Sequence, residues 1–386
     1  MKIAVVGVGT VGVLSVCHWL RYTQNTQIYS IHNKNIKILG IGETTNVHFT
    51  DDIYHASGFH MAEHANELDA TFKTAVKWVN WRDQDFFTHI VPPAYGIHFN
   101  NWKIHNVIFD KIKKKSPDRF FEIEGNVDNI INSQDKATVV VDGEGHDFDI
   151  VIDCMGYPKS YEDYNEIDVI PVNSALVNLI HEPGNWGAYT FHQATPHGWM
   201  FGIPLQTRQG WGYLYNNKIT PKEEAVDYLK FIMKDKFNTD LKEFSFKNYY
   251  AKQFIDGRIL KNGNKALFFE PLEAIAGVFW NHCNRAMWDV VFQGHTEEDA
   301  NDRLKLRAES YINFISFIYK NGSKFNSPFW EITKKKCNKH LDNSYLWQRE
   351  KEYIFNYKPG DEVRPPDFIT FPFELDVWQD FITKFD

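Results

Sequence analysis

Cysteine is scarce in this sequence, which has four cysteines among 386 residues. They stand far apart, at positions 17, 154, 283 and 337, with no C-x-x-C pair and no close cluster of histidines around them. This spacing indicates neither a disulfide framework nor a zinc knuckle. A reducing compartment fits such a chain, and we expect it to be cytoplasmic.

Positive charge is also in short supply. Lys and Arg total 42 against 50 Asp and Glu, which gives a formal net charge of −8, and the only sustained basic tract is Lys111 with 113–115. Nucleic-acid binding normally needs a basic face that neutralises phosphates. We therefore expect no nucleic-acid partner.

Long apolar runs are missing, since no segment reaches the roughly 18 residues that a membrane-spanning helix needs. The apolar stretch 3–16 stands where a signal peptide would, but glycines interrupt it and it lacks an A-x-A-like cleavage site. We expect no membrane association. Obvious linkers and internal repeats are missing too, so the parts of the chain are expected to be interleaved.

Aromatic residues, in contrast, are abundant at 16%, in a composition that is 43% hydrophobic and 24% charged. Such a composition is typical of a globular protein with a large core. We expect most of the rings to fill core volume, although some could enclose a flat substrate.

The N-terminal segment has the pattern of a dinucleotide-binding unit. An apolar run at 2–6 leads into Gly7-Val8-Gly9-Thr10-Val11-Gly12 and then into a stretch with helical periodicity. In this strand-turn-helix order, Gly7 permits the tight turn, Gly9 lets a pyrophosphate approach the backbone, and Gly12 allows close packing of helix on strand. The next strand, 27–32, ends without an acidic residue, so it does not distinguish FAD from NAD.

Further elements are predicted from periodicity. Residues 119–153 contain several short strands, with a hairpin at 142–145 and a last strand whose end, at Asp153 to Gly156, suggests a second contact with the nucleotide. Helices are predicted at 223–234 and 298–320. The last 45 or so residues lack a clear period, and we expect irregular structure there.

Two patterns bear on catalysis and on metals. Residues 71–81 (TFKTAVKWVNW) alternate as one strand, which places Lys73 and Lys77 on the same face. His55, His60 and His64 have no acidic or cysteine ligand at a convincing spacing, so no metal site is expected.

Four further segments resemble flavin-dependent halogenases of the tryptophan halogenase type. Residues 197–205 (HGWMFGIPL) resemble the family's GWxWxIP signature, with Phe201 at the second Trp, and 40–45 (GIGETT) resemble its GVGEAT loop. The sequence FEPLE at 269–273 resembles FVEPLE, and SPFW at 327–330 resembles TPFW. With the glycine turn, the resemblance covers about residues 1–340 in matching order.

The resemblance implies an α/β chain with a Rossmann-like FAD-binding fold of the flavin monooxygenase and halogenase type. We expect residues 1–386 to form a single interlocked unit with a substrate-covering region interleaved in it. The FAD-binding parts are expected at about 1–50, 98–160 and 258–300. The substrate-covering parts are expected at about 51–97, 161–257 and 301–386.

The resemblance also assigns site residues. The catalytic pair would be Lys73 and Glu273. The expected contacts to FAD are Gly7, Gly9, Thr10, Val11, Gly12, Gly42, Glu43, Thr44, Thr45, Val127, Gly156, Gly277 and Val278. The expected halide segment is Ile275, Ala276 and Gly277. Trp199, Phe201 and Pro204 would separate substrate from flavin.

In this family, FAD reduced by a separate flavin reductase, O2 and halide together yield hypohalous acid, which moves to an aromatic substrate. Lys73 would hold the electrophile there, and Glu273 would polarise it or accept the proton of the ring. Lys77 is the rival to Lys73. Two other functions stay open, a flavin-dependent monooxygenase or oxidase and a non-catalytic flavin-binding protein, as does a homo-oligomeric state.

Three departures from the family pattern modify these expectations. The segment 82–97 is short, which predicts a less enclosed site and broad acceptance of electron-rich aromatics. After Glu273, Ala274-Ile275-Ala276-Gly277 replaces Ser-Thr-Gly, which predicts a preference for bromide or iodide over chloride. The segment 264–267 is shortened, so weak FAD binding is expected.

Overall fold

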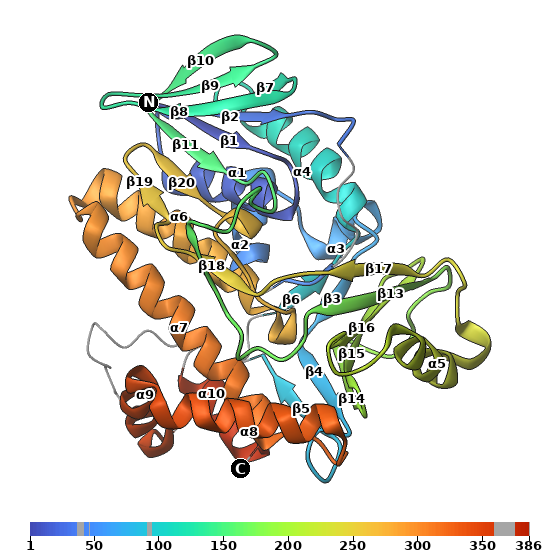
Figure 1. The fold of residues 1–386 in the computed structure, drawn as a ribbon. Helices are drawn as coiled ribbons and strands as arrows, with labels where there is room; N and C mark the ends of the chain where they lie inside the picture. Colours follow the sequence, from blue (N-terminus) through green and yellow to red (C-terminus); the bar gives the residue numbers. More distant parts are fainter. Residues whose placement is uncertain (37–41, 46, 91–94, 359–374, 386) are drawn as a thin grey trace.

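A computed structural model describes residues 1–36, 42–45, 47–90, 95–358 and 375–385 of the chain (Figure 1). Its first layer is a six-stranded sheet in the order β19-β20-β11-β1-β2-β7. The strands are β1 (Lys2–Val6), β2 (Gln27–His32), β7 (Phe120–Glu124), β11 (Ile150–Asp153), β19 (Ile255–Asp256) and β20 (Ile259–Lys261). All neighbours are parallel except β19 and β20. The predicted Rossmann-like sheet is confirmed.

A small antiparallel sheet packs beside β1, β2 and β11 around a second apolar core. It consists of β8 (Val127–Asn132), β9 (Ala137–Val141) and β10 (Glu144–Phe148), at the top of Figure 1. The turn between β9 and β10 has positive φ at both Asp142 (47°) and Gly143 (84°), as a tight hairpin turn requires. The predicted hairpin is confirmed.

The second large layer is a seven-stranded sheet in the order β17-β13-β16-β15-β14-β4-β5. Its strands are β4 (Ala75–Val79), β5 (Phe86–His89), β13 (Ser174–Ile180), β14 (Tyr189–Thr195), β15 (Gly198–Pro204), β16 (Gln209–Tyr215) and β17 (Lys242–Ser245). Short strands complete two smaller sheets, namely β3 (Thr71–Lys73) with β6 (Gly96–His98), and β12 (Tyr164–Glu166), β18 (Tyr249–Ala251) and β21 (Leu267–Phe268).

Helices cover the first sheet and form the C-terminal part, and one helix, Lys222–Met233, packs on the second sheet. They are α1 (Thr10–Tyr22), α2 (Val47–Ser57), α3 (Met61–His64), α4 (Asn101–Lys115), α5 (Lys222–Met233), α6 (Ile275–Gln293), α7 (Glu297–Asn321), α8 (Pro328–Asn343), α9 (Tyr345–Asn356) and α10 (Leu375–Phe385). Single 3-10 turns are η1 (Ala65–Glu67), η2 (Lys234–Lys236), η3 (Gly263–Lys265) and η4 (Leu272–Ala274). The predicted helices at 223–234 and 298–320 correspond to α5 and α7. Among the described helices, none has the length and apolar character to cross a membrane.

The C-terminal region is helical where it is described, so the expectation of irregular structure was wrong. In α9 the Ser344 side chain accepts a hydrogen bond from the Trp347 N–H (3.1 Å), and Leu346, Trp347 and Ile354 are buried. These apolar positions share one helical face, but polar and aromatic residues between them hide the period. The helices α8, α9 and α10 lie together at the bottom of Figure 1.

The aromatic side chains mainly fill the core, as expected. Six tryptophans are each less than 2% exposed, namely Trp19, Trp78, Trp81, Trp199, Trp330 and Trp378. Several of these rings meet edge to face, which is a favourable arrangement for aromatic pairs. All four cysteines are free.

Candidate active site

The glycine turn between β1 and α1 has the geometry of a pyrophosphate cradle. Gly7 has φ of 97°, and a Cβ there would lie 2.7 Å from the Cys154 carbonyl oxygen. A Cβ on Gly12 would overlap the Gly7 carbonyl, so α1 packs tightly on the turn. Around Gly9, in contrast, nothing in the described part of the chain lies within 4 Å of a Cβ position, apart from the adjoining residues. The turn therefore leaves an open face at the N-terminus of α1, where an anionic group is favoured.

Several distant segments converge on this turn. Thr10 Oγ1 donates to Asn101 Oδ1 at the start of α4 (2.7 Å), and Val11 packs against Gly263 of η3. Cys154 adjoins Gly7, which confirms that the end of β11 lies beside the turn. Gly156 beyond it has φ of 82° and an open face.

Residues 42–45 form the second part of the expected cofactor site. The Thr45 N–H donates to the Ile97 carbonyl (2.9 Å), which ties this segment to β6. Glu43 is 1% exposed, accepts a hydrogen bond from the Asn101 N–H (3.0 Å), and forms an ion pair with the buried Arg208. Burial raises the pKa of Glu43, while Arg208 opposes that shift.

The remaining expected FAD contacts occupy less central places. Gly277 and Val278 lie in the first turn of α6, and Val127 starts β8 just beyond the end of β7. The residues present fit a dinucleotide on one structural ground: at Gly9, Gly42 and Gly156, no atom of the described residues beyond the adjoining backbone lies within 4 Å of the position that a Cβ would take. Extended cofactors approach protein backbones at such glycines.

Lys73 ends β3 and is buried, with 5% exposure. Burial lowers the pKa of its ammonium group, and electrostatic attraction from Glu273 opposes that shift. A buried cation is stable only near a compensating charge, and Glu273 supplies one. Lys73 and Glu273, the pair that the resemblance assigns as catalytic, thus lie within electrostatic range of each other.

Two buried histidines complete the surroundings of Lys73. The ring nitrogens of His98 lie 3.0 Å from Thr71 Oγ1 and 2.9 Å from Thr190 Oγ1. Burial first, and then the charge of Lys73, hold the pKa values of His98 and His192 well below their ordinary range. Both rings are therefore uncharged at neutral pH.

Glu273 is held in an unusual backbone conformation. Its φ is 59° and that of Ala274 is 53°, which are values that residues with a Cβ adopt at a cost of about 1–2 kcal/mol. The strain is concentrated where η4 meets α6. Non-glycine residues kept in such conformations are concentrated at functional sites.

Glu270 is a second carboxyl group beside this site. It is fully buried, and its Oε2 accepts hydrogen bonds from Trp199 Nε1 and from the Tyr319 hydroxyl, each 2.8 Å long. Burial raises the pKa of Glu270 to about 8, although the two hydrogen bonds oppose the shift. The group is therefore largely protonated at neutral pH.

The residues expected to separate substrate from flavin lie on β15. The Trp199 ring packs against His192, with ring centroids 4.8 Å apart. A Cβ on Gly212, in the adjacent β16, would overlap the Phe201 ring. The Pro204 carbonyl accepts a hydrogen bond from Thr71 Oγ1 (2.6 Å), which ties the end of β15 to the strand that carries Lys73.

The prediction of a single strand at 71–81 was wrong, because the strand is interrupted at Thr74. There the Thr74 N–H and hydroxyl both donate to the Ala188 carbonyl, at 2.7 and 3.0 Å, so β3 and β4 join different sheets. Lys77 is partly exposed, with Nζ 5.7 Å from the centre of the Phe87 ring. It therefore does not share a face with Lys73.

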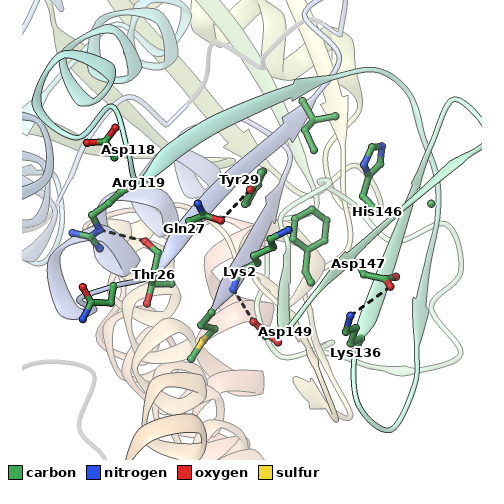
Figure 2. A pocket seen from close by; sticks show the side chains of 15 residues that line it. Lys2, Thr26, Gln27, Tyr29, Asp118, Arg119, Lys136, His146, Asp147 and Asp149 are labelled. Atoms are coloured by element: carbon green, nitrogen blue, oxygen red, sulfur yellow. Dashed lines mark hydrogen bonds and ion pairs between the residues drawn. The ribbon is translucent and has the colours of Figure 1, made fainter.

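A cavity of about 810 Å³ lies at the end of the first sheet that is opposite the glycine turn (Figure 2). It is lined by residues at the beginnings of the strands, such as Lys2, Gln27 and Arg119. Figure 2 shows its polar groups in local contacts, such as Lys2 with Asp149 (2.7 Å) and Arg119 with Thr26 (3.3 Å). Ligands of open α/β sheets bind at the carboxyl ends of the strands, so this cavity is not the active site.

Sequence patterns did not identify His98, Thr190 and His192 around Lys73, because three separate strands, β3, β6 and β14, bring these residues together. Alternation along 189–195 is the one signal that could have helped, since it puts Thr190 and His192 on the same strand face. Ile275, Ala276 and Gly277, the expected halide segment, form the first turn of α6 behind the strained residues.

Comparison with known proteins agrees with this geometry. The family model described as tryptophan halogenase matches residues 2–134 and 121–358. Tryptophan 7-halogenase RebH of Lentzea aerocolonigenes is 21% identical, over 95% of this chain and 83% of RebH. Tryptophan 6-halogenase ThaL of Streptomyces albogriseolus is 22% identical, over 94% of this chain and 83% of ThaL.

Solved structures share the fold. A tryptophan halogenase from Shewanella frigidimarina superposes with a TM-score of 0.79 and 17% identity, over 99% of this chain and 88% of that one. Xcc4156, a flavin-dependent halogenase from Xanthomonas campestris, gives 0.78 and 15%, over 98% and 88%.

Proposed function

This chain belongs to the tryptophan halogenase family, and from that premise we propose that it halogenates electron-rich aromatic compounds with Lys73 as the residue that delivers the halogen. Enzymes of this family use reduced FAD, O2 and a halide. The proposal concerns how the residues of this chain serve that reaction.

One observation supports the proposal above all others: Lys73 is buried beside Glu273, among imidazoles that carry no charge at neutral pH. Burial lowers the pKa of Lys73, which increases the fraction of neutral, nucleophilic amine near neutral pH. Such an amine can hydrogen-bond hypohalous acid, or it can form a haloamine: the N–halogen bond forms as the O–halogen bond breaks, and the oxygen leaves as water with one proton of the amine. A solvated surface lysine would have neither a lowered pKa nor a fixed position.

Bound in its reduced form, FAD would supply the chemistry that converts O2 and halide into hypohalous acid. The backbone at Gly7, Gly9 and Gly12 would hold its pyrophosphate, and 42–45 would lie over it. Trp199 and Phe201 are buried on β15, and the Trp199 indole N–H donates to Glu270, which precedes the turn that carries Glu273. We propose that this aromatic wall keeps the substrate away from the flavin.

Glu273 acts on the substrate side in this proposal. Its carboxylate compensates the charge of Lys73 and can take the proton that leaves the ring after halogen addition. The strained backbone of Glu273 and Ala274 fixes the direction of that carboxylate.

Two finer features follow from this chain's own residues. Ala274, Ile275 and Ala276 offer no side-chain hydroxyl, so a strongly hydrated chloride loses more than bromide or iodide on entering the site. The short segment 82–97 leaves fewer groups to discriminate among substrates, so we expect several indoles and phenols to be accepted with weak preference.

The decisive experiment supplies the protein with FAD, a flavin reductase, NADH, bromide and a panel of indoles and phenols, and then measures product masses. We expect brominated products from several substrates and poor turnover of free tryptophan. A parallel reaction without halide tests the monooxygenase alternative, which predicts hydroxylated product. A protein that gives neither product and does not accelerate reoxidation of reduced FAD would be a non-catalytic flavin-binding protein.

A further inference from the structure

Three metal-ligating side chains converge at the end of β2, outside the site around Lys73. His32 is the last residue of β2, Glu122 lies in the adjacent β7, and His105 lies on α4, which packs against β7. Glu122 Oε1 lies 3.8 Å from His32 Nε2 and 3.6 Å from His105 Nε2. One ligand atom from each residue lies within 4.8 Å of the others.

These separations are too long for hydrogen bonds and suited to a shared ion. An N–H···O bond spans about 2.7–3.2 Å, whereas ligands placed about 2.0–2.2 Å from one zinc ion lie somewhat more than 3 Å apart. Bringing the three ligand atoms to coordination distance from one ion therefore requires movements of about 1 Å or less. Ordinary changes in side-chain conformation allow such movements.

The surroundings orient the ligands. Ser30 Oγ lies 3.5 Å from His32 Nδ1, on the far side of the ring from Glu122. Nδ1 of His32 therefore faces Ser30, and Nε2, the nitrogen available to a metal ion, faces the carboxylate.

The cluster is also accessible. The His32 side chain is 7% exposed, while those of His105 and Glu122 are 14% and 23% exposed, so water or an ion can enter from one side. Lys113 forms an ion pair with Glu122 Oε2, the oxygen that faces away from the histidine contacts, and its side chain is 49% exposed. A lysine of that exposure can withdraw into solvent when a metal neutralises the carboxylate.

We propose that His32, His105 and Glu122 form a binding site for a divalent transition-metal ion, with zinc as the preferred ion, that links β2, β7 and α4. Two imidazoles and one carboxylate are a common donor set for zinc, and a water molecule can complete the tetrahedron. The ion would fix α4 against the sheet at the carboxyl end of β2. Zinc keeps its oxidation state, so no redox step is involved.

The test titrates the full-length protein, first freed of metal with a chelator, with zinc chloride in a non-coordinating buffer at pH 7.5. We expect one ion per chain by calorimetry, with a rise of about 5 °C in the melting temperature at saturation. In His105→Asn and Glu122→Gln, affinity should fall by about 100-fold, since each loses a ligand. His55→Asn is the matched control, because His55 also lies near a carboxylate, Asp51 (3.4 Å), but in an exposed pair without a third ligand.

Two outcomes would overturn the proposal. One is stoichiometric zinc binding that survives in the double variant His32→Asn, His105→Asn, which would assign the ion to surface histidines. The other is no binding by the parent protein at micromolar zinc. Should the variants fold poorly by circular dichroism, cobalt in the parent protein decides the question: intense visible absorption bands indicate a tetrahedral site with nitrogen ligands, and weak octahedral bands refute it.

Discussion

The Trp199 indole N–H donates to Glu270 Oε2 across 2.8 Å, deep in the core and three residues before Glu273. This bond connects the aromatic wall on β15 with the turn that carries the expected catalytic carboxylate. Tyr319 donates to the same oxygen, so three elements meet at one buried carboxyl group.

Glu270 should make stability depend on pH. Its pKa is raised from an ordinary 4.5 to about 8, so its contribution to stability is fully present below pH 4.5 and is lost as the pH rises through 8. Across this window, the free energy of unfolding of the parent protein should fall, relative to that of Glu270→Gln, by up to about 1.4 kcal/mol per pH unit. Chemical denaturation measures this difference. Glu350→Gln should show a pH dependence of the same sign over a narrower window, since burial raises the pKa of Glu350 from 4.5 to about 7 in α9. A pH-independent difference for Glu270→Gln would mean that Glu270 is ionised in the fold.

Lys73 should be essential for product formation but not for flavin oxidation. Lys73→Met preserves much of the buried volume, and we expect halogenated product to fall by about 100-fold or more while oxygen consumption stays normal. Lys77→Ala, on the outer face, should keep most of the activity. The reverse ranking of the two variants would move the role to Lys77.

The backbone conformation of Glu273 should cost stability. Glu273→Gly and Glu273→Gln both remove the charge that compensates Lys73, but only Glu273→Gly relieves the φ of 59°. We therefore expect Glu273→Gly to be more stable than Glu273→Gln, by up to about 1 kcal/mol, and both variants to lose product. Calorimetric melting and product assays on the two variants separate the effects, and a Glu273→Gly protein no more stable than Glu273→Gln would contradict this account.

The glycine turn should separate folding from cofactor binding. Gly9→Val places its side chain in open space, so the protein should fold normally while FAD binding, followed by fluorescence quenching, is lost. Gly12→Val would drive a side chain into the Gly7 carbonyl and should fold poorly. Normal FAD affinity in folded Gly9→Val would place the cofactor elsewhere.

Halide choice is tested by competition. With equal bromide and chloride, or iodide and chloride, we expect mass spectrometry to show mainly the heavier halogen in the product, because chloride pays the larger dehydration cost next to Ala274 and Ala276. An enzyme-free reaction with the corresponding hypohalites corrects for intrinsic reactivity. A clear preference for chloride would mean that backbone N–H groups at the start of α6 suffice to hold it.

The parts of this protein that the sequence could predict are those whose cause is local. Gly7 is required by its own φ of 97°, Gly12 by its contact with the Gly7 carbonyl in the same strand-turn-helix unit, and the Asp142-Gly143 hairpin by its own backbone angles. The pairing of Lys73 with Glu273 came from resemblance to a family, since nothing in the spacing of two such distant residues indicates contact.

What could not be predicted depends on packing between segments. Alternation runs unbroken from Lys73 to Lys77 in the sequence, and only the bonds of Thr74 to Ala188 divide the strand between two sheets. Likewise, the shifted pKa values of His98 and His192 arise from burial, which a sequence does not display. Local patterns thus identify the cofactor unit, whereas the electrostatics of the site emerge only in the assembled fold.

The overlap between a Cβ at Gly212 and the ring of Phe201 has an evolutionary consequence. A residue with a side chain is tolerated at position 212 only after a smaller residue has replaced Phe201. Replacing Phe201 first leaves a cavity beside a buried strand. Each single step away from the present pair is therefore harmful, although some double changes would be tolerated. The two positions are epistatic, and a mutational search that aims to reshape this wall has to vary them together.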